Sequence, residues 1–392
     1  MLSRRLFLQT GGLASCLALA GSLVSPIALA PAPGENCLIV IILRGAMDGL
    51  DVFQPYGDPE LRKLRRTISL GPEQGAHDLD GFFALHPELA SLHPLWQKGE
   101  LAFAPAVATP YRDKRSHFEG QDLLEAGTGM DLSLLHQRDG WLNRLLAEMP
   151  KATSETAYSV GIGQMRILAG KVAAKSWAPS IDLQLTPQAQ RLLQLVYHDD
   201  PLFRTECQEA MEIAAEGAGP GRKEKGPDRE VRALARFTAQ QLKGETRIAA
   251  FSLPGWDSHA RQAKSLVKAL RSLSVAIVTL REELGPKWSR TAVLALTEFG
   301  RTVRENGAAG TDHGTGSAAI LAGGTLRGGR ALGAWPGLGE SDLYGGRDLM
   351  PLEDVRRYAA WTLRSLFGIE RNLLETTVFP GLEMGPDPGL IA

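Results

Sequence analysis

The sequence predicts an α/β protein in which a mainly parallel central sheet is sandwiched between layers of helices. Residues 37–43 (CLIVIIL) form a continuous apolar run rich in β-branched side chains, which is typical of a strand covered on both faces. Similar apolar runs alternate with helical patterns along most of the 392 residues, and this alternation favours a parallel sheet with crossover helices. The length suits one large domain, which we expect over residues 31–392.

Residues 1–30 are predicted to be a twin-arginine signal peptide. Residues 3–9 (SRRLFLQ) carry two adjacent arginines, a weakly apolar segment follows at 11–29, and small residues at 28–30 (ALA) match a cleavage site. The alternative is an uncleaved amino-terminal anchor. The pattern predicts export by the twin-arginine translocase and a periplasmic or secreted mature protein that does not associate with the membrane.

The first half of the chain is expected to alternate between strands and helices. Strands are predicted at 37–43 and 101–104 and, in short pieces, within 158–169, and helices at 86–95, 116–124, 141–149 and 186–196. A glycine-rich turn at 44–49 follows the first strand. In open α/β sheets, ligands bind at the carboxyl ends of the strands, so this turn is a candidate part of a site.

The second half begins with a predicted flexible linker near 216–230 (EGAGPGRKEKGPDRE), which is rich in Gly, Pro and charge. Apolar residues then recur at helical spacing over 263–284. Further helices are expected at 231–242 and 352–367, a strand at 246–251, and a polar hairpin-like segment between residues 324 and 348.

Residues 291–324 combine structural and chemical signals. They predict a buried strand that ends at Glu298, a turn that carries Arg301, a glycine-rich loop that carries Asp312 and His313, and a second apolar strand. Gly310 and Gly314 flank the Asp-His pair, and a core role does not suit a charged pair there, so a functional role is favoured.

Polar residues also follow three other predicted strands. The four groups are Arg44 with Asp48, Ser116 with His117, Asp257 with His259, and Glu298 and Arg301 with Asp312 and His313. Carboxylates and imidazoles are the ligands of zinc, manganese or magnesium at hydrolytic sites. Because all four groups lie at predicted strand ends, we expect them on one edge of the sheet.

Several of these residues also have a structural interpretation. Ser116 and Glu119 match a capping box, which would explain both without catalysis. Asp48 lies before Gly49 and could serve only to shape a turn. The two arginines, Arg44 and Arg301, could pair with carboxylates or could bind an anionic substrate.

Charge and cysteine content exclude other classes of protein. A formal net charge of -1 argues against nucleic-acid binding, which requires an excess of Lys and Arg. The mature chain retains Cys37 and Cys207, and neither has a partner at metal-ligand spacing. A disulfide between them is chemically possible in an oxidising compartment, whereas Cys37 at the start of an apolar strand also suits a buried thiol.

Together with the twin-arginine start, four motifs resemble the DUF1501 family: ILRGAMDGLD, SHFEGQDLLEAGTG, PGWDSHA and TEFGRTVRENGAAGTDHGTGSAAILAGG. Proteins of that family are exported, have no assigned function and are related to the alkaline phosphatase and sulfatase superfamily. The resemblance implies an alkaline phosphatase-like sandwich of helices around the sheet.

The resemblance also implies roles for individual residues. Ser116 falls where a nucleophile would open a helix. Asp257 and His259 look like an Asp and a His of a first metal, and His313, with Asp312 beside it, looks like that metal's second His.

The sequence departs from the superfamily pattern at the second metal. Glu298-Phe299 stands where the superfamily has an Asp-His pair, and Arg44 stands where an Asp normally closes the first strand. The site could therefore hold one metal, a differently arranged pair or none. If the protein is a hydrolase, Glu298 and Asp48 would complete or support the metal shell, and Arg301 or Arg44 would neutralise the transferring group.

Two functions follow from these expectations. The first is a hydrolase of phosphate or sulfate esters that uses a divalent metal, either zinc, manganese, magnesium or calcium, and acts on an anionic small molecule. The alternative is a non-catalytic periplasmic binding or assembly protein that kept the fold and lost the metal pair.

Overall fold

A computed structural model describes residues 34–130, 139–161, 165–178 and 228–392. The predicted signal peptide, the predicted helix at 186–196, Cys207 and residues 216–227 of the predicted linker lie outside the described residues. Helix α9 begins at Arg229, so the last residues of the predicted linker belong to a helix. In the described ranges, no helix is both long and apolar enough to cross a lipid bilayer.

An eight-stranded sheet forms the centre of the molecule, with the strand order β13-β5-β10-β9-β1-β8-β6-β7. The strands are β1 (Cys37–Arg44), β5 (Leu101–Ala108), β6 (Ala157–Val160), β7 (Lys175–Trp177), β8 (Ile248–Pro254), β9 (Thr291–Leu296), β10 (Ser317–Ala322) and β13 (Glu353–Asp354). Only β10 pairs antiparallel with its neighbours in this sheet, and the other pairs are parallel. The predicted mainly parallel α/β fold is therefore confirmed.

Strand β1 lies between β8 and β9 and shows why the predicted apolar run is continuous. Leu38, Val40 and Ile42 pack into one core cluster, whereas the intervening Ile39 and Ile41 pack into the other. Successive side chains of a strand point to opposite faces, so both faces need apolar residues when helices cover both.

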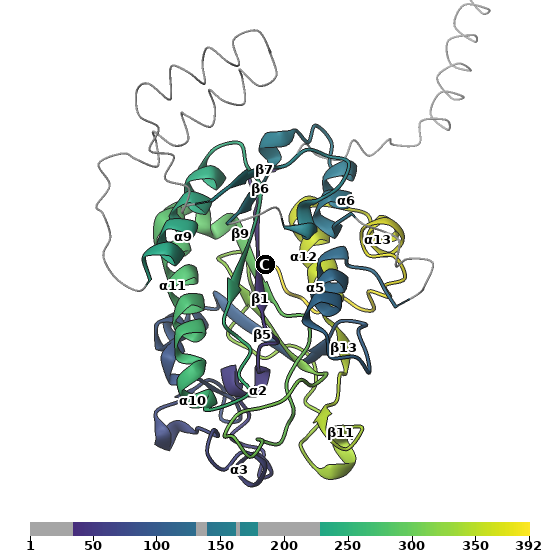
Figure 1. Cartoon of the computed structure of the whole chain (residues 1–392). Coiled ribbons are helices and arrows are strands. Elements are labelled where there is room, and N and C mark those ends of the chain that lie inside the picture. The colour runs from purple at the N-terminus through teal and green to yellow at the C-terminus, as the bar shows by residue number, and fades with distance from the viewer. Residues whose placement is uncertain (1–33, 131–138, 162–164, 179–227) are drawn as a thin grey trace, which may run out of the picture.

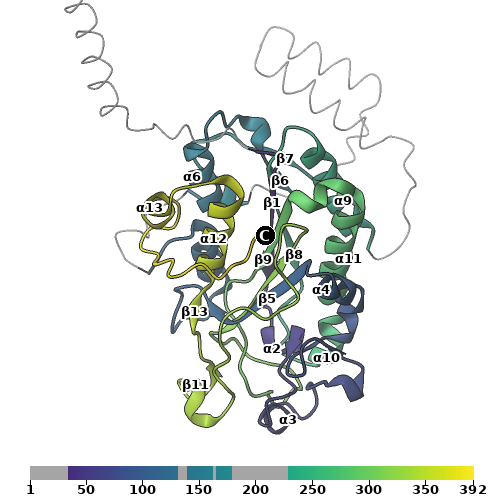
Figure 2. The ribbon, with the colours of Figure 1, turned by 180° about the vertical axis from the view of Figure 1, so that it is seen from behind.

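The two helical layers are visible on either side of the sheet (Figures 1 and 2). One layer contains α9 (Arg229–Lys243), α11 (Val267–Leu284) and α4 (His93–Gln97), and the other contains α5 (His117–Ala126), α6 (Trp141–Glu148), α12 (Val355–Phe367) and α13 (Arg371–Leu373). The apolar spacing predicted for 263–284 is found mainly in α11, after the short helix α10 (Gln262–Ser265).

Several smaller elements lie outside the central sheet and its two helical layers. They are a three-stranded sheet of β2 (Phe53–Gln54), β4 (Ala84–Leu85) and β3 (His77–Asp78), the short helices α2 (Gly49–Val52) and α3 (Leu61–Leu64), and the hairpin β11 (Leu343–Tyr344) with β12 (Asp348–Leu349). The hairpin lies within the polar segment for which a hairpin-like structure was predicted. The helix predicted at 86–95 is instead a 3₁₀ helix, Pro87–Leu92, that continues into α4.

The reversed direction of β10 determines where the glycine-rich loop lies. Residues 297–316 connect β9 to β10 without a crossover helix, which is possible because antiparallel strands need none. The amino end of β10 therefore lies at the same edge as the carboxyl ends of β9, β1 and β8. Residues that precede β10 and residues that follow β8 consequently meet.

Candidate metal centre

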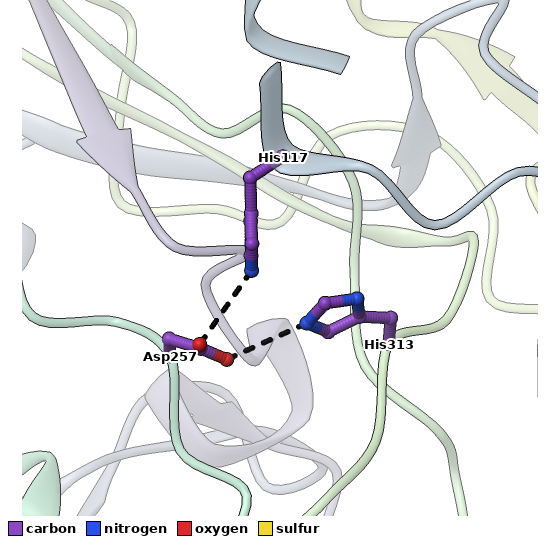
Figure 3. A group of neighbouring side chains, drawn as sticks. All are labelled: His117, Asp257 and His313. Carbon is purple, nitrogen blue, oxygen red and sulfur yellow. Dashed lines mark hydrogen bonds and ion pairs between the residues drawn. The ribbon is translucent and has the colours of Figure 1, made fainter. Parts of the chain in front are cut away.

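His117, Asp257 and His313 converge at this edge of the sheet (Figure 3). One potential ligand atom of each lies within 4.8 Å of those of the other two. His117 opens α5, Asp257 follows β8, and His313 precedes β10. Three segments that are distant in sequence thus supply two imidazoles and a carboxylate to one point.

His117 is oriented by a buried carboxylate. Its Nδ1 lies 2.9 Å from Oε1 of Glu298, whose side chain is fully buried, so Nδ1 carries the proton and Nε2 carries a lone pair. Nε2 lies 3.6 Å from Oδ2 of Asp257, and it is buried without a hydrogen-bond partner among the described residues. The hydrogen bond to Glu298 raises the pKa of His117 above its usual value, although burial opposes this.

His313 is oriented by a main-chain carbonyl. Its Nδ1 lies 3.0 Å from the carbonyl oxygen of Arg115, which can only accept, so Nε2 again carries the lone pair. That Nε2 lies 3.4 Å from Oδ1 of Asp257. Burial lowers the pKa of His313, which favours the neutral imidazole that binds metals.

A third imidazole, His259, lies beside this pair. Its Nδ1 is 3.2 Å from Oδ1 of Asp312, and its Nε2 is 3.0 Å from both Oδ1 of Asp257 and Nε2 of His313. With Nδ1 donating to Asp312, Nε2 of His259 also presents a lone pair. Two imidazole lone pairs at 3.0 Å repel unless a proton or a metal ion lies between them.

This donor set fits a divalent metal ion. Each of three imidazoles donates Nδ1–H to an oxygen acceptor, on Glu298, Asp312 or Arg115, and this is the usual arrangement of histidines that bind metal through Nε2. Imidazole nitrogens and a carboxylate oxygen are common ligands of divalent metal ions. The side chains of Asp257 and His259 are 48% and 46% exposed, so water and small molecules can reach the centre.

Asp257 is fixed by Arg301, which is almost fully buried. The guanidinium donates to Oδ1 of Asp257 at 2.6 Å and to the carbonyls of Gly45 at 2.6 Å, Ala46 at 2.8 Å and Thr311 at 3.1 Å. Burial alone would raise the pKa of Asp257, but the hydrogen bond and charge of Arg301, together with the charges of His259 and His117, outweigh burial and lower the pKa. The geometry favours Arg301 as a residue that orients a ligand, because carbonyls occupy its remaining donors.

Glu298 is similarly placed behind the centre rather than in it. Its carboxylate accepts hydrogen bonds from the Gly45 amide at 2.9 Å and Gln121 at 3.1 Å in addition to His117. Burial would raise its pKa, yet the hydrogen bonds from His117 and Gln121 lower it overall, so the carboxylate is ionised. An ionised acceptor on Nδ1 increases the basicity of Nε2 in His117.

The turn after β1 requires glycine at position 45. Gly45 has φ +118°, and a Cβ there would come within 2.6 Å of the Asp257 amide nitrogen. The close approach lets the Gly45 amide reach Glu298 and its carbonyl reach Arg301. Through these two hydrogen bonds, the turn after β1 helps to position Glu298 behind His117 and Arg301 behind Asp257.

Three predicted site residues have other contacts. Arg44 forms an ion pair with Glu125 at 2.6 Å and donates to Gln121 at 2.7 Å. Asp48 caps α2 and forms a buried ion pair with Arg65 at 2.7 Å. Ser116 is the N-cap of α5, where its hydroxyl accepts from the Glu119 amide at 3.4 Å, as expected for the capping interpretation.

The sequence motifs place His117 in the right loop but give the metal role to other residues. The capping box accounts for Ser116 and Glu119 and leaves the imidazole between them unexplained. Its pairing with Glu298, 181 positions away, is a tertiary contact without a spacing signal. The predicted ligands Asp257, His259 and His313 do lie together, with Asp312 behind His259.

Fold and site together define a broad class, which is an α/β protein with a mainly parallel sheet and a candidate metal centre at one edge. The chain belongs to the family described as protein of unknown function (DUF1501), whose model matches residues 70–374. This confirms the family predicted from the motifs. No curated protein matches the chain in sequence.

Solved structures with a similar fold include members of the alkaline phosphatase class. The integral membrane lipooligosaccharide phosphoethanolamine transferase A (EptA) from Neisseria meningitidis has 10% identity and a TM-score of 0.40, over 80% of this chain and 54% of that chain. The periplasmic domain of phosphoethanolamine transferase EptC from Campylobacter jejuni has 8% identity and a TM-score of 0.41, over 91% and 99%. A protein in the alkaline phosphatase superfamily from Vibrio parahaemolyticus has 11% identity and a TM-score of 0.37, over 86% and 68%.

The chain thus spans about half the length of the EptA chain that it matches. These similarities concern the arrangement of strands and helices. Conclusions about the metal centre rest on the contacts of this chain's own residues.

Proposed function

We propose that this protein is an exported, divalent-metal-dependent hydrolase of phosphate or sulfate esters. The observation that carries the proposal is the convergence of the Nε2 lone pairs of His117, His259 and His313 on the solvent-accessible carboxylate of Asp257. We further propose that the twin-arginine translocase exports the chain, that residues 1–30 are removed, and that residues 31–392 act as one domain in the periplasm.

His117, Asp257 and His313 would hold the metal, with His259 as a fourth ligand. A bound divalent ion would supply Lewis-acid chemistry, since it polarises an ester oxygen and stabilises negative charge that develops on it. Zinc fits the imidazole-rich set best, and manganese, magnesium and calcium favour more oxygen ligands.

The chain's own residues would prepare this centre. Glu298 and the Arg115 carbonyl keep two imidazoles in the tautomer that exposes Nε2. Arg301 keeps the Asp257 carboxylate ionised and in place. Arg347 donates to the main-chain carbonyl of His313 at 2.9 Å, and the main-chain carbonyl of the exposed Arg115 contacts the His313 ring. Two arginines adjoin His313, and their positive charge would favour an anionic substrate.

Ser116 is the candidate nucleophile among the residues of this chain. Its hydroxyl accepts a long hydrogen bond of 3.4 Å as a helix cap and retains its own proton for donation. The amino end of α5 favours negative charge on that oxygen. Ser116 directly precedes the ligand His117.

A non-catalytic metal-binding or assembly role is the second candidate. One observation favours it: both predicted catalytic arginines are paired within the protein, Arg44 with Glu125 and Arg301 with Asp257. A protein of this kind would bind the metal without turning over esters.

Elemental analysis and turnover together separate these functions. The exported protein, Asp257→Asn, His313→Ala and the control His77→Asn would be compared for metal content, for thermal stabilisation by each of the four metals, and for hydrolysis of aryl phosphates and aryl sulfates. His77 is a matched control because it lies in β3 of the separate three-stranded sheet, where its ring stacks on His93 of α4. We expect the unmodified protein and the control to bind metal and hydrolyse an ester, and the two ligand variants to do neither.

Two other outcomes would overturn the proposal in different ways. Absence of bound metal, together with no stabilisation by any added metal, would reject the metal centre itself. Bound metal without hydrolysis of either ester class would favour the non-catalytic role.

A further inference from the structure

Gln262 lies behind the metal centre and is shielded from solvent. Its side chain is hydrogen-bonded to Asp48, Asp51, Ser258 and Thr311. It is the first residue of α10 and is fully buried. Its Nε2 donates to Oδ2 of Asp48 at 2.6 Å and to Oδ2 of Asp51 at 3.0 Å. Buried polar groups of this kind are normally paired in full, and these two bonds account for the amide nitrogen.

The other side of the same amide faces the two loops that carry the proposed ligands. Its Oε1 accepts from the Ser258 hydroxyl at 3.0 Å and from the Thr311 hydroxyl at 2.7 Å. Ser258 lies between Asp257 and His259, and Thr311 precedes Asp312. The Thr311 amide also donates to the Ser258 carbonyl at 3.1 Å, so the two loops are joined directly behind the ligands.

The orientation of the amide is determined by its four partners. The Asp48 carboxylate, which is ion-paired with Arg65, can only accept, so it selects Nε2, and the two hydroxyls then donate to Oε1. The carboxylates are anchored in turn, because Arg65 binds Asp48 through two hydrogen bonds of 2.7 and 3.0 Å. Gln262 is therefore held in place by the buried Asp48–Arg65 ion pair and in turn holds both ligand loops through Ser258 and Thr311.

We infer that Gln262 is a positioning residue for the metal centre, which sets the spacing between the loop of Asp257 and His259 and the loop of His313. This inference rests on the proposed metal-dependent function. Residues that hold metal ligands in place commonly change metal affinity by about 10- to 100-fold when they are replaced.

Gln54 provides a matched control for a substitution at Gln262. It is also a buried glutamine, and its Nε2 donates to the other oxygen of Asp51 at 2.8 Å. Its further partners are the main chain at Ile68 and Leu70, away from both ligand loops. Gln262→Leu and Gln54→Leu each remove a buried amide from the same carboxyl group, but only the first releases the loops.

The test is titration of the chelator-stripped exported protein with Zn²⁺ in competition with a chromogenic chelator, together with the visible absorption spectrum of the Co²⁺-loaded protein. We expect Gln262→Leu to raise the Kd for Zn²⁺ by about tenfold or more and to shift the Co²⁺ spectrum. Gln54→Leu should change the Kd by less than about threefold and leave the spectrum unchanged, even if both variants lose similar stability.

A smaller substitution covers the case in which Gln262→Leu does not fold. Thr311→Val removes one hydroxyl contact to Gln262 with little change in shape, and it should raise the Kd and shift the Co²⁺ spectrum in the same direction. The inference is overturned if the unmodified protein binds Zn²⁺ and neither Gln262→Leu nor Thr311→Val differs from Gln54→Leu. Failure of the unmodified protein to bind either metal would instead reject the metal centre and, with it, this role.

Discussion

Two clusters of charged residues lie at the same edge of the sheet and differ in how their charge is balanced. In the buried cluster, Asp48 is hydrogen-bonded to Arg65, and both Asp48 and Asp51 are hydrogen-bonded to the Gln262 amide. In the metal centre, imidazole lone pairs face the carboxylate of Asp257, which is half exposed.

The comparison shows what distinguishes a structural cluster from a candidate metal site. The buried cluster contains its own cation, because the Arg65 guanidinium binds both oxygens of Asp48 and the carbonyls of Thr302 and Val303. In the metal centre, Arg301 lies behind Asp257, and the Nε2 atoms of His117, His259 and His313 converge on the Asp257 carboxylate. A guanidinium bound to the carboxylate is typical of a structural ion pair, whereas imidazole lone pairs that converge on a half-exposed carboxylate are typical of a candidate metal site.

The largest expected effect comes from removing the cation of the buried cluster. Arg65→Met leaves two buried carboxylates without a counter-ion and should reduce the free energy of unfolding by about 3–5 kcal/mol in urea titration. Arg62→Met is the control, since Arg62 lies in α3, the helix directly before Arg65, and its side chain is 63% exposed; its effect should stay within about 0.5 kcal/mol. Equal losses in the two variants would contradict the distinction between the clusters.

Removing a proposed metal ligand should mainly abolish the stabilisation by metal, whereas Arg65→Met should destabilise the protein without metal. Metal at about a hundredfold excess over its Kd should stabilise the unmodified protein by about 2.7 kcal/mol, whereas Asp257→Asn should gain nothing from metal. In the presence of a chelator, Asp257→Asn should lose less stability than Arg65→Met, because the half-exposed amide oxygen can still accept from Arg301 and the guanidinium keeps its carbonyl partners. A large loss for Asp257→Asn in chelator would identify Asp257 as a structural residue.

Protonation gives a third way to compare the clusters, because the buried cluster has two carboxylates and one guanidinium. Burial, assisted by the nearby charge of Asp48, raises the pKa of Asp51 to about 7. The folded state then retains a proton that the unfolded chain has lost, so this group makes stability fall as the pH rises from about 4 to about 7.

Asp51→Asn should remove that dependence. The variant keeps the shape of the side chain without the titration, so its stability relative to the unmodified protein should rise across the same pH range, by about 1 kcal/mol or more at pH 8. Urea unfolding at pH 4.5, 6 and 8 measures the difference. A constant difference between the two proteins over this range would show that Asp51 does not titrate there.

The sequence predicted the α/β fold and most of its strands and helices, and it predicted some of the residues that meet at the metal centre. Strand β1 was predictable because a strand that is buried on both faces has a continuous apolar run. Helix α11 was predictable because a helix that is buried on one face has apolar residues every three or four positions. The same patterns located the loops of Asp257, His259 and His313. The reversed direction of β10 has no such signal, since a fully buried strand looks the same in either direction.

Contacts between distant residues account for what the sequence did not reveal. Asp48 and Asp257 are both carboxylates in loops after strands, and only the structure shows that Arg65 neutralises the first. Similarly, Glu298 was expected to complete or support the metal shell, and its position behind His117 depends on the Gly45 turn and on α5. Spacing along the chain does not encode these pairings.

The smallest expected effect concerns Ser116, where a structural and a catalytic role coincide. Loss of the helix cap in Ser116→Ala should cost about 1 kcal/mol of stability. Ser116→Asn restores a capping acceptor without a hydroxyl, so it should recover most of that stability. If Ser116 is only a cap, ester hydrolysis should follow stability and return in Ser116→Asn. If its hydroxyl is the nucleophile, hydrolysis should be lost in both variants while metal content stays unchanged, because neither substitution alters His117, Asp257 or His313.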